Sequence, residues 1–335
     1  RRGVASHRLL LRSEEEMALF LSEQDVTELL TMPLALAEVE AAHRALSTRQ
    51  AHDVPRQRTR LPQTTLHILQ GALPQLDVIG YKAYTSNRSG VRFLVHLYRA
   101  STGCLLAVIE ADRLGMIRTA AASGVATRWL ARPDATVAGV FGAGWQAEGH
   151  IEAIAAVRPL QRVKVYARRA DRLASFCARL SQRLGIEVSA AASPEEVVRG
   201  CDIVSTVTTA ATPLFDAGWL APGTHINAAG SNSLIRREVG EDVIKRCAPI
   251  VVDSVESALR EAGDLLPLLE KGRLHARELV ELGDVICGLQ PGRSNAEAIT
   301  LFESQGMAIQ DLAVAARLVE MARARGIGVE LPYGG

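Results

Sequence analysis

The stretch VAGVFGAGWQAEGH, residues 137–150, decides the fold of this chain. It begins as an apolar run, turns at Gly142-Ala143-Gly144 and continues as a helix-like segment. In a dinucleotide-binding turn the first glycine permits the tight turn, the second lets the backbone approach a pyrophosphate, and the third position packs helix on strand. Gly142, Gly144 and Ala147 stand in those places, and the N–H groups at a helix start suit a diphosphate. The alternative, ordinary turn glycines, is disfavoured by this strand-to-helix context.

Strand-like and helix-like segments alternate from this point towards the C-terminus. The predicted strands are 135–141, 162–167, 187–191, 202–207, 224–229 and 249–253. Alternation of this kind predicts an α/β fold, a doubly wound parallel sheet of the Rossmann type.

The chain before this region has a different pattern. Residues 22–46 have apolar positions at helical spacing after a Ser22 cap, which predicts one or two helices with a break at Pro33. Residues 58–110 contain short β-type runs separated by Gly, Asn and Ser, as in a meander. An Ala-rich helix is expected over 116–131, and residues 294–326 are expected to be helical again and to return to the first domain.

These patterns predict two domains. Residues 17–117 and 307–335 are expected to form one domain and residues 118–306 the dinucleotide-binding one. Residues 1–16 combine arginines with Glu14-Glu15-Glu16 and are expected to be a leader or a disordered extension.

Composition excludes several classes of function. The 335 residues are 48% hydrophobic and 22% charged with a net charge of +1, which disfavours a nucleic-acid or membrane partner. The five cysteines lack a paired spacing, which predicts reduced thiols in a cytoplasmic protein. The eight histidines show no metal-ligand spacing, so no metal is expected, and His67, His96 and His225 are expected to be packing residues.

The second predicted strand of the dinucleotide domain lacks a feature of NAD-binding proteins. Such a strand normally ends in an Asp or Glu that binds the adenine ribose, but here Ala167 is followed by Arg168 and Arg169. A guanidinium at this place pairs with a 2′-phosphate, which favours NADP(H), although NAD(H) stays possible. The alternative is that both arginines form a solvated helix start.

The chain resembles the ornithine cyclodeaminase/mu-crystallin family from about residue 23 to residue 328. The motifs that carry this resemblance are GYKAYTS (80–86), MIRTAAASGVAT (116–127), GAGWQAE (142–148), HINAAGSNSLIRREV (225–239), EAGDLLPLLEKG (261–272) and PGRSNAEAITLFESQGMAIQDLA (291–313). The resemblance implies a Rossmann domain joined to a β-rich α+β domain that binds substrate and forms a homodimer. It also implies a nicotinamide cofactor.

By the same resemblance, Arg58, Lys82 and Arg118 match basic residues around a substrate carboxylate. Two arginines suit planar contacts with a carboxylate, and a lysine among like charges exchanges a proton near neutral pH once its pKa is lowered. Arg56 and Arg60 are alternatives to Arg58 within VPRQRTRLP. Simple surface solvation is the competing interpretation for all three.

The resemblance, together with the glycine turn and the arginine pair after the second strand, indicates a set of cofactor-binding residues. They are Arg118, Thr119, Gly142, Gly144, Trp145, Gln146, Arg168, Arg169, Thr206, Val207, Thr208, Ala229, Gly230 and Ser304. Thr206 and Thr208 fit equally well as strand residues without a ligand. Gln305 and Met307, beside Ser304 and Gly306, are expected to help select the substrate.

One position departs from the cyclodeaminases, which carry an aspartate in a Gly-x-Asp turn where this chain has Gly230-Ser231-Asn232. An amide is not a base at any relevant pH, so ornithine cyclisation is disfavoured. Hydride transfer needs less from this position, because an amide still orients a substrate amine. Lys82 and Asn232 are therefore the predicted catalytic residues.

These inferences favour an NADP(H)-dependent oxidoreductase of a small 2-amino or 2-imino acid, of the imine reductase or amino-acid dehydrogenase type. In this scheme Arg58 and Arg118 hold the carboxylate and Lys82 manages the proton. Two alternatives stay open: a cyclodeaminase-type lyase with bound NAD, and a non-catalytic NADPH-dependent ligand-binding protein of the mu-crystallin type.

Overall fold

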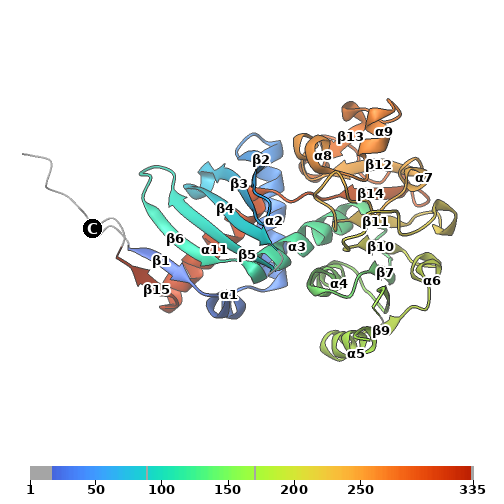
Figure 1. The fold of residues 1–335 in the computed structure, drawn as a ribbon, viewed down its shortest axis with the longest axis horizontal. Helices are drawn as coiled ribbons and strands as arrows, with labels where there is room; N and C mark the ends of the chain where they lie inside the picture. The colour runs from blue at the N-terminus through green and yellow to red at the C-terminus, as the bar shows by residue number, and fades with distance from the viewer. Residues whose placement is uncertain (1–16, 88–89, 170, 333–335) are drawn as a thin grey trace, which may run out of the picture.

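The computed structural model describes residues 17–87, 90–169 and 171–332, and residues 1–16, with the predicted leader, lie outside them. These residues form two lobes, each built on one β-sheet (Figure 1). The first sheet has seven strands and the second has eight.

The first lobe contains segments from both ends of the described chain. Its strands are β1 (Ala18–Leu21), β2 (His52–Arg60), β3 (Thr65–Leu73), β4 (Val78–Asn87), β5 (Gly90–Arg99), β6 (Leu105–Glu110) and β15 (Val329–Leu331). Its helices are α1 (Glu23–Leu29), α2 (Met32–Ser47), the 3₁₀ helix η1 (Pro74–Leu76), α3 (Asp112–Leu130) and α11 (Ala308–Arg325).

The second lobe is built from the middle of the chain. Its strands are β7 (Val137–Phe141), β8 (Arg162–Tyr166), β9 (Glu187–Ala190), β10 (Ile203–Thr206), β11 (His225–Ala228), β12 (Cys247–Val252), β13 (Leu279–Glu281) and β14 (Ile299–Glu303). Its helices are α4 (Trp145–Val157), α5 (Leu173–Leu184), α6 (Pro194–Val198), α7 (Glu241–Ile244), α8 (Val255–Glu261), α9 (Leu266–Glu270) and α10 (Leu282–Ile286), with 3₁₀ helices η2 (Ala217–Trp219) and η3 (Ala276–Glu278).

The first sheet confirms the predicted meander and extends it. Strands β2 to β6 pair in sequence as antiparallel neighbours, while β1 pairs parallel with β6 and antiparallel with β15. The sequence analysis did not predict β1, β15 or the start of β2 at His52. Strands of three and four residues are too short to show a period of two, so β1 and β15 carry no clear signal.

The second sheet confirms the predicted doubly wound parallel fold. Its order is β13-β12-β14-β11-β10-β7-β8-β9, and every neighbouring pair is parallel. One prediction was wrong: residues 294–326 are not all helical, because β14 lies inside the sheet between β11 and β12. All five residues of β14 are buried, and periodicity alone does not separate a short, fully buried strand from a buried helix.

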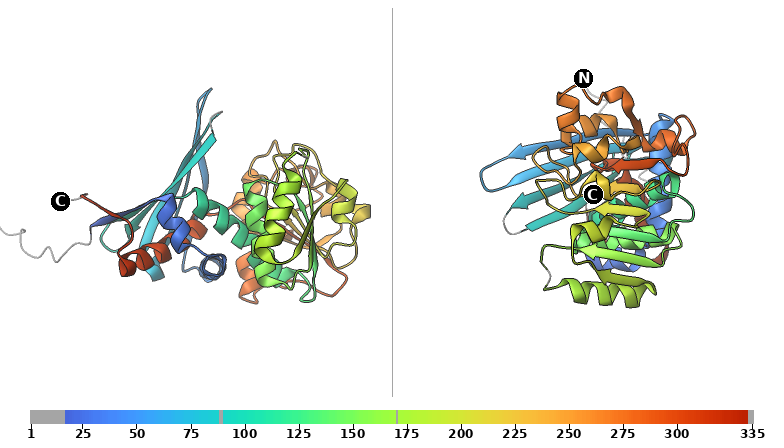
Figure 2. Two further views of the ribbon diagram at one scale, coloured as in Figure 1. Left: turned by 90° about the horizontal axis from the view of Figure 1, so that it is seen from below. Right: turned by 90° about the vertical axis from the view of Figure 1, so that its right-hand side faces the viewer.

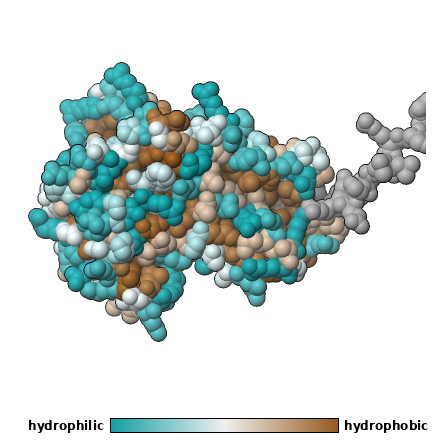
Figure 3. Space-filling model, turned by 180° about the vertical axis from the view of Figure 1, so that it is seen from behind, coloured by the Kyte–Doolittle hydropathy of each residue, from teal (hydrophilic) through white to brown (hydrophobic). Residues whose placement is uncertain are grey.

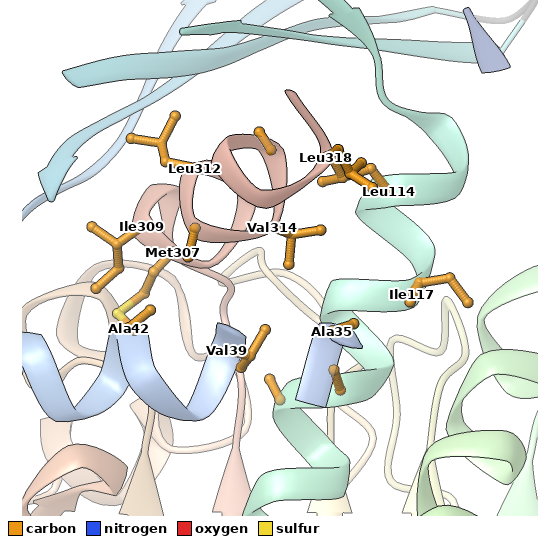
Figure 4. Close-up of a cluster of buried hydrophobic side chains, with 14 of the residues drawn as sticks. Ala35, Val39, Ala42, Leu114, Ile117, Met307, Ile309, Leu312, Val314 and Leu318 are labelled. Atoms are coloured by element: carbon orange, nitrogen blue, oxygen red, sulfur yellow. The ribbon is translucent and has the colours of Figure 1, made fainter. Parts of the chain in front are cut away.

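Helix α11 carries the C-terminal part of the chain back under the first sheet. Leu312 approaches Gly80 of β4, and Ile309 approaches Gly71 of β3. The same helix packs on α2 and α3, with Leu312, Val314 and Leu318 facing the core (Figure 4). Burial of this apolar cluster fixes α11, and with it the polar residues of its first turn, against the sheet.

The two lobes lie side by side, and α3 reaches from one towards the other (Figures 1 and 2). Figure 3 shows the same two lobes from behind, with hydrophobic residues scattered over both. The predicted domain limits, 17–117 with 307–335 and 118–306, stay a proposal, and the limit at 117/118 falls inside α3. Among the described helices, none combines the length and the apolar character that spanning a bilayer requires.

Candidate functional site

A cavity of about 520 Å³ lies between the lobes. The second lobe contributes the segments that follow the carboxyl ends of β10, β11 and β14, the usual place for a ligand in an open α/β sheet. The first lobe contributes β2 to β5 and one face of α3. Its lining residues are Arg56, Arg58, Arg60, Thr65, His67, Lys82, Tyr84, Ser86, Val91, Phe93, Gly115, Arg118, Thr119, Trp145, Gln146, Val207, Thr208, Thr209, Ala229, Gly230, Ser231, Asn232, Ser233, Ile235, Arg236, Ser304, Gln305 and Gly306.

The glycine turn beside this cavity has the geometry that a pyrophosphate needs. Gly142 has φ +114°, a conformation that disfavours any residue with a side chain. A Cβ there would also lie only 2.8 Å from the carbonyl oxygen of Val207. Gly144 is the N-cap of α4, and no atom lies within 4 Å of where its Cβ would be. No side chain caps the helix, so its first N–H groups are available to an anion.

Arg168 and Arg169 follow β8 beside this turn. Both side chains are exposed, and neither makes an ion pair with another described residue. Ala167, which precedes them, brings no carboxylate to the strand end. Two guanidinium groups without an ion-pair partner among the described residues therefore follow β8, at the strand end where dinucleotide-binding proteins normally carry an acidic residue.

Lys82 and Arg118 meet at a single buried carboxylate. Lys82 Nζ donates to Asp311 Oδ1 at 2.9 Å, and Arg118 Nε donates to the same oxygen at 2.9 Å. Arg118 Nη1 also donates to Gln310 Oε1 at 2.9 Å. Strand β4, helix α3 and helix α11 therefore converge on one buried polar cluster.

The pKa of the Lys82 ammonium group is shifted down towards neutral pH. Its side chain is 2% exposed, and burial, with Arg118 nearby, lowers the pKa of Lys82 to about 7 against the opposing effect of Asp311. The lowered pKa agrees with the expectation from the sequence. A group with this pKa both gives and takes a proton under physiological conditions.

Arg56 and Arg58 form a second buried cluster. Both guanidinium groups bind Glu261, with Arg56 on Oε2 and Arg58 on Oε1. Arg56 Nη2 also donates to the carbonyl of Gln305, and Arg58 Nη2 donates to the carbonyl of Asn232, each at 2.8 Å. These bonds tie β2 to two loops of the second lobe and hold both guanidinium groups in place.

Asn232 lies in the cavity wall, and its amide makes no hydrogen bond to another described residue. Among the described residues of the lining there is no aspartate or glutamate. The wall therefore has no exposed carboxylate in the place of the aspartate that the resemblance implies for a cyclodeaminase.

Two buried carboxylates hold the loops of the second lobe in shape. Glu238 accepts hydrogen bonds from the backbone N–H of Thr208 at 2.6 Å and of Gly230 at 2.9 Å. Asp253 accepts from Ser304 Oγ at 3.0 Å, from the Gln305 N–H at 2.8 Å and from the Gly306 N–H at 2.6 Å. Because these bonds fix the backbone, side chains such as Val207 and Ser304 keep their places in the wall.

The structure brings most of the predicted site residues together. Those in the lining are Arg58, Lys82, Arg118, Thr119, Trp145, Gln146, Val207, Thr208, Ala229, Gly230, Asn232 and Ser304. Gly142, Gly144, Arg168 and Arg169 lie outside it, around the turn and the end of β8. Thr206 is fully buried within β10 and does not reach the cavity.

Met307 was wrongly expected to help select the substrate. Its side chain is fully buried in the core of the first lobe, where Figure 4 shows it below Ile309, and it is not part of the lining. The reason is local, because Met307 is the N-cap residue of α11 and turns into the core as that helix begins. Gln305 does line the cavity, although its amide is bound to Glu303 at 3.0 Å.

Sequence reasoning missed Glu261 and Asp311. Both lay inside motifs that carry the family resemblance, EAGD and QDLA, but neither was given a role. A signal for Asp311 was present: Gln310-Asp311 is a polar pair within the apolar face of MAIQDLAVAARL, and such a pair needs buried partners. No comparable signal marked Glu261.

The described part of the chain contains no group of three or more His, Cys, Asp or Glu side chains that could hold a metal ion. His225 bonds to Thr300 and Asn227, and burial lowers the pKa of His225 to about 3. All five cysteines, each in a described segment, have free thiols.

Comparison with known proteins places these features in context. The model of the ornithine cyclodeaminase/mu-crystallin family matches residues 16–326. A Δ1-pyrroline-2-carboxylate reductase of Bacillus cereus is 36% identical over 279 residues, which cover 81% of this chain and 86% of that protein.

Two solved structures have the same fold. The Δ1-pyrroline-2-carboxylate reductase of Thermococcus litoralis, in complex with NADH and L-proline, matches with a TM-score of 0.90 and 31% identity over 93% of this chain and all of the other. An archaeal alanine dehydrogenase dimer with bound NAD matches with a TM-score of 0.89 and 32% identity, over 94% of this chain and 99% of the other.

Proposed function

The chain belongs to the ornithine cyclodeaminase/mu-crystallin family, and from that premise we propose that it reduces a small 2-imino acid to the amino acid with NADPH. It is an oxidoreductase that uses a nicotinamide cofactor and acts on C–N bonds of small imino or amino acids. The observation that carries the proposal is the buried Lys82–Asp311–Arg118 cluster in the wall of a cavity beside the dinucleotide turn.

The basic residues of the cavity wall have different roles in the proposed reduction. Arg118, together with Arg58, holds the substrate carboxylate by charge-assisted hydrogen bonds. Lys82, as the ammonium, donates its proton to the imine nitrogen, and the neutral amine that remains recovers a proton from solvent. When bound, the reduced nicotinamide supplies a hydride to the α-carbon. The overall reaction converts the imino acid, NADPH and one proton into the amino acid and NADP⁺.

The alternatives are less well supported by the same geometry. A cyclodeaminase-type lyase needs a base where this chain has Asn232, and the described lining offers no carboxylate in its place. A purely binding protein does not need a proton donor, whereas Lys82 lies in the cavity wall with its pKa lowered to about 7 by burial. Steady NADPH oxidation with imino acids separates the reductase from both.

We expect NADPH to bind about tenfold tighter than NADH, a difference of about 1.4 kcal/mol. The free guanidinium groups of Arg168 and Arg169, with no acid at Ala167, suit a 2′-phosphate. Fluorescence titration with both cofactors measures the ratio. Ala167→Asp and Arg168→Ala are each expected to lower it, whereas Arg162→Ala, at the other end of β8, serves as the matched control. Equal affinities in the unchanged protein would refute the preference.

We propose a homodimer that pairs through the outer face of the first sheet. This face carries exposed Ile79, at 47%, and Leu94, at 38%, next to a stack of Tyr81 on His96, while α11 covers the inner face. An uncovered apolar sheet face of this kind is an association surface.

Light scattering is expected to give twice the 36.0 kDa of one chain at micromolar concentration. Ile79→Lys should shift the mass towards the monomer, since it places a charge on the exposed apolar face of the first sheet. Leu289→Lys, at a 62% exposed position in the second lobe, is the control. A monomeric mass for the unchanged protein would exclude the dimer.

We expect no ammonia or proline from ornithine, because Asn232 cannot act as a base. Asn232→Asp should raise KM for an imino acid by about tenfold, since the new carboxylate competes with the substrate carboxylate for the arginines of the wall. Ammonia, proline and NADPH are measured on the same samples. Robust proline formation by the unchanged protein would overturn the assignment of Asn232.

A further inference from the structure

The cavity wall continues well beyond Lys82 along the first sheet. Residues on alternate positions of a strand share one face and lie roughly 7 Å apart, so Tyr84 and Ser86 extend the wall in two steps from Lys82. Tyr84 and Ser86 each have cross-strand partners on the neighbouring strands, and each set of partners forms a row across the sheet. The middle row is Arg58–His67–Tyr84–Phe93, and the outer row is Arg60–Thr65–Ser86–Val91.

The middle row is largely aromatic, and Arg58 is its charged member. His67 stacks on Tyr84 with ring centroids 4.3 Å apart, and Tyr84 contacts Phe93 at 4.7 Å. Burial, followed by the nearby Arg58 and Arg56, lowers the pKa of His67 to about 4, so its ring is neutral. Such a surface covers the aliphatic part of a substrate side chain.

Positive charge dominates the lining as a whole. Its cationic residues are Arg56, Arg58, Arg60, Lys82, Arg118 and Arg236, and among the described lining residues there is no aspartate or glutamate. Behind the wall, Glu261 pairs with Arg56 and Arg58, while Asp311 pairs with Lys82 and Arg118.

Arg60 and Arg236 have no such counter-ion among the described residues. They come from different lobes, Arg60 from the outer row of the sheet and Arg236 from the loop after β11. The α-carboxylate of a substrate is already served by Arg58 and Arg118. The charge of Arg60 and Arg236 is therefore left for a second group of the ligand.

Resting on the function proposed above, we propose that the preferred substrate is an imino acid with a second carboxylate on its side chain, bound by Arg60 and Arg236. The aliphatic part of the side chain lies along the middle row, and the distal carboxylate meets the guanidinium groups. The same wall disfavours a basic side chain, because a distal ammonium would lie among cations with no carboxylate in the lining.

Pairs of substrates matched in chain length test this inference. 2-Oxoglutarate and 2-oxopentanoate, each with methylamine and NADPH, give imino acids that differ only in the distal carboxylate. We expect kcat/KM to be at least about tenfold higher for the acidic member. The pair 2-oxoadipate and 2-oxohexanoate repeats the comparison with one more methylene. Equal values, or a preference for the neutral members, would overturn the proposal.

Variants then assign the preference to residues. Arg60→Gln and Arg236→Gln should each lower the ratio of acidic to neutral kcat/KM by about fivefold or more, mainly through KM for the acidic substrate. Arg317→Gln, an exposed arginine on α11 outside the cavity, should leave the ratio unchanged. A ratio unchanged in both cavity variants would contradict the assignment.

Calorimetry separates this inference from the proposed function. If no imino acid is turned over, imine reduction is refuted, and binding of glutarate and pentanoate to the NADPH complex still decides the charge preference. Glutarate should bind at least about tenfold tighter than pentanoate. Equal affinities would refute the second-carboxylate site even in an active reductase.

Discussion

Replacing Lys82 with methionine is expected to lower kcat for imine reduction by about a thousandfold and to leave NADPH affinity nearly unchanged. Methionine keeps an unbranched stem near the Phe93 ring, whose centroid lies 5.4 Å from Nζ, and removes the ammonium group with both its proton and its charge. The dinucleotide turn at Gly142 and Gly144 belongs to the other lobe, so cofactor binding does not depend on this side chain. Single-turnover kinetics with pre-bound NADPH measures the effect on the chemical step.

Lys82→Arg separates the proton from the charge. Arginine keeps a cation next to Asp311, but it does not release its proton near neutral pH. Both variants are therefore expected to be inactive. Undiminished turnover in either would show that Lys82 is not the proton donor.

The pH dependence follows from the same group. Because the pKa of Lys82 is about 7, the ammonium form predominates below that pH and the free amine above it. kcat/KM for reduction should accordingly fall as the pH rises through about 7, and that for amino-acid oxidation should fall as the pH drops through the same range. If kcat/KM did not change near pH 7 for either reduction or oxidation, the assignment would be contradicted.

Asp311→Ala is expected to lower the free energy of unfolding by about 3–5 kcal/mol. Asp311 is fully buried and pairs with both Lys82 and Arg118, so its removal leaves the Arg118 guanidinium and the Lys82 amino group buried without their shared counter-ion. Urea unfolding at fixed protein concentration measures the change.

Two further variants test this explanation. Asp134→Ala, with a side chain 81% exposed, should change stability by less than about 0.5 kcal/mol. In the Lys82→Met background Asp311→Ala should cost less, because only Arg118 is then left unpaired. A loss below about 1 kcal/mol in the otherwise unchanged protein would mean that solvent or another group compensates the two basic groups.

The sequence predicted the second lobe better than the first. The alternation of strands with helices and the glycine turn are local signals, and they placed β7 to β12 to within a few residues. Strand β14 was missed because five consecutive buried residues look alike in a strand and in a buried helix. Strands β1 and β15 were missed because each depends on pairing with distant parts of the chain.

The candidate site was predicted only in part, again because local motifs are visible in the sequence and long-range contacts are not. Lys82, Arg118 and Asn232 lie in distinctive motifs, and the structure brings all three to one cavity. The counter-ions Glu261 and Asp311 are more than 190 residues away from the cations they bind, and only the fold reveals such pairs. The uncompensated charge of Arg60 and Arg236 likewise emerges only when the partners of all the cavity cations are known.

The central claim is that this chain transfers a hydride to the α-carbon of an imino acid. NADPH with deuterium in place of both hydrogens at C4 of the nicotinamide is incubated with the protein, methylamine and 2-oxoglutarate. In a parallel sample, Δ1-pyrroline-2-carboxylate replaces methylamine and 2-oxoglutarate. The products of both samples are analysed by mass spectrometry. The account predicts one deuterium at the α-carbon of the amino acid formed from at least one of them, and none with Lys82→Met. Unlabelled products, with proline and ammonia released from ornithine at constant NADPH, would contradict it.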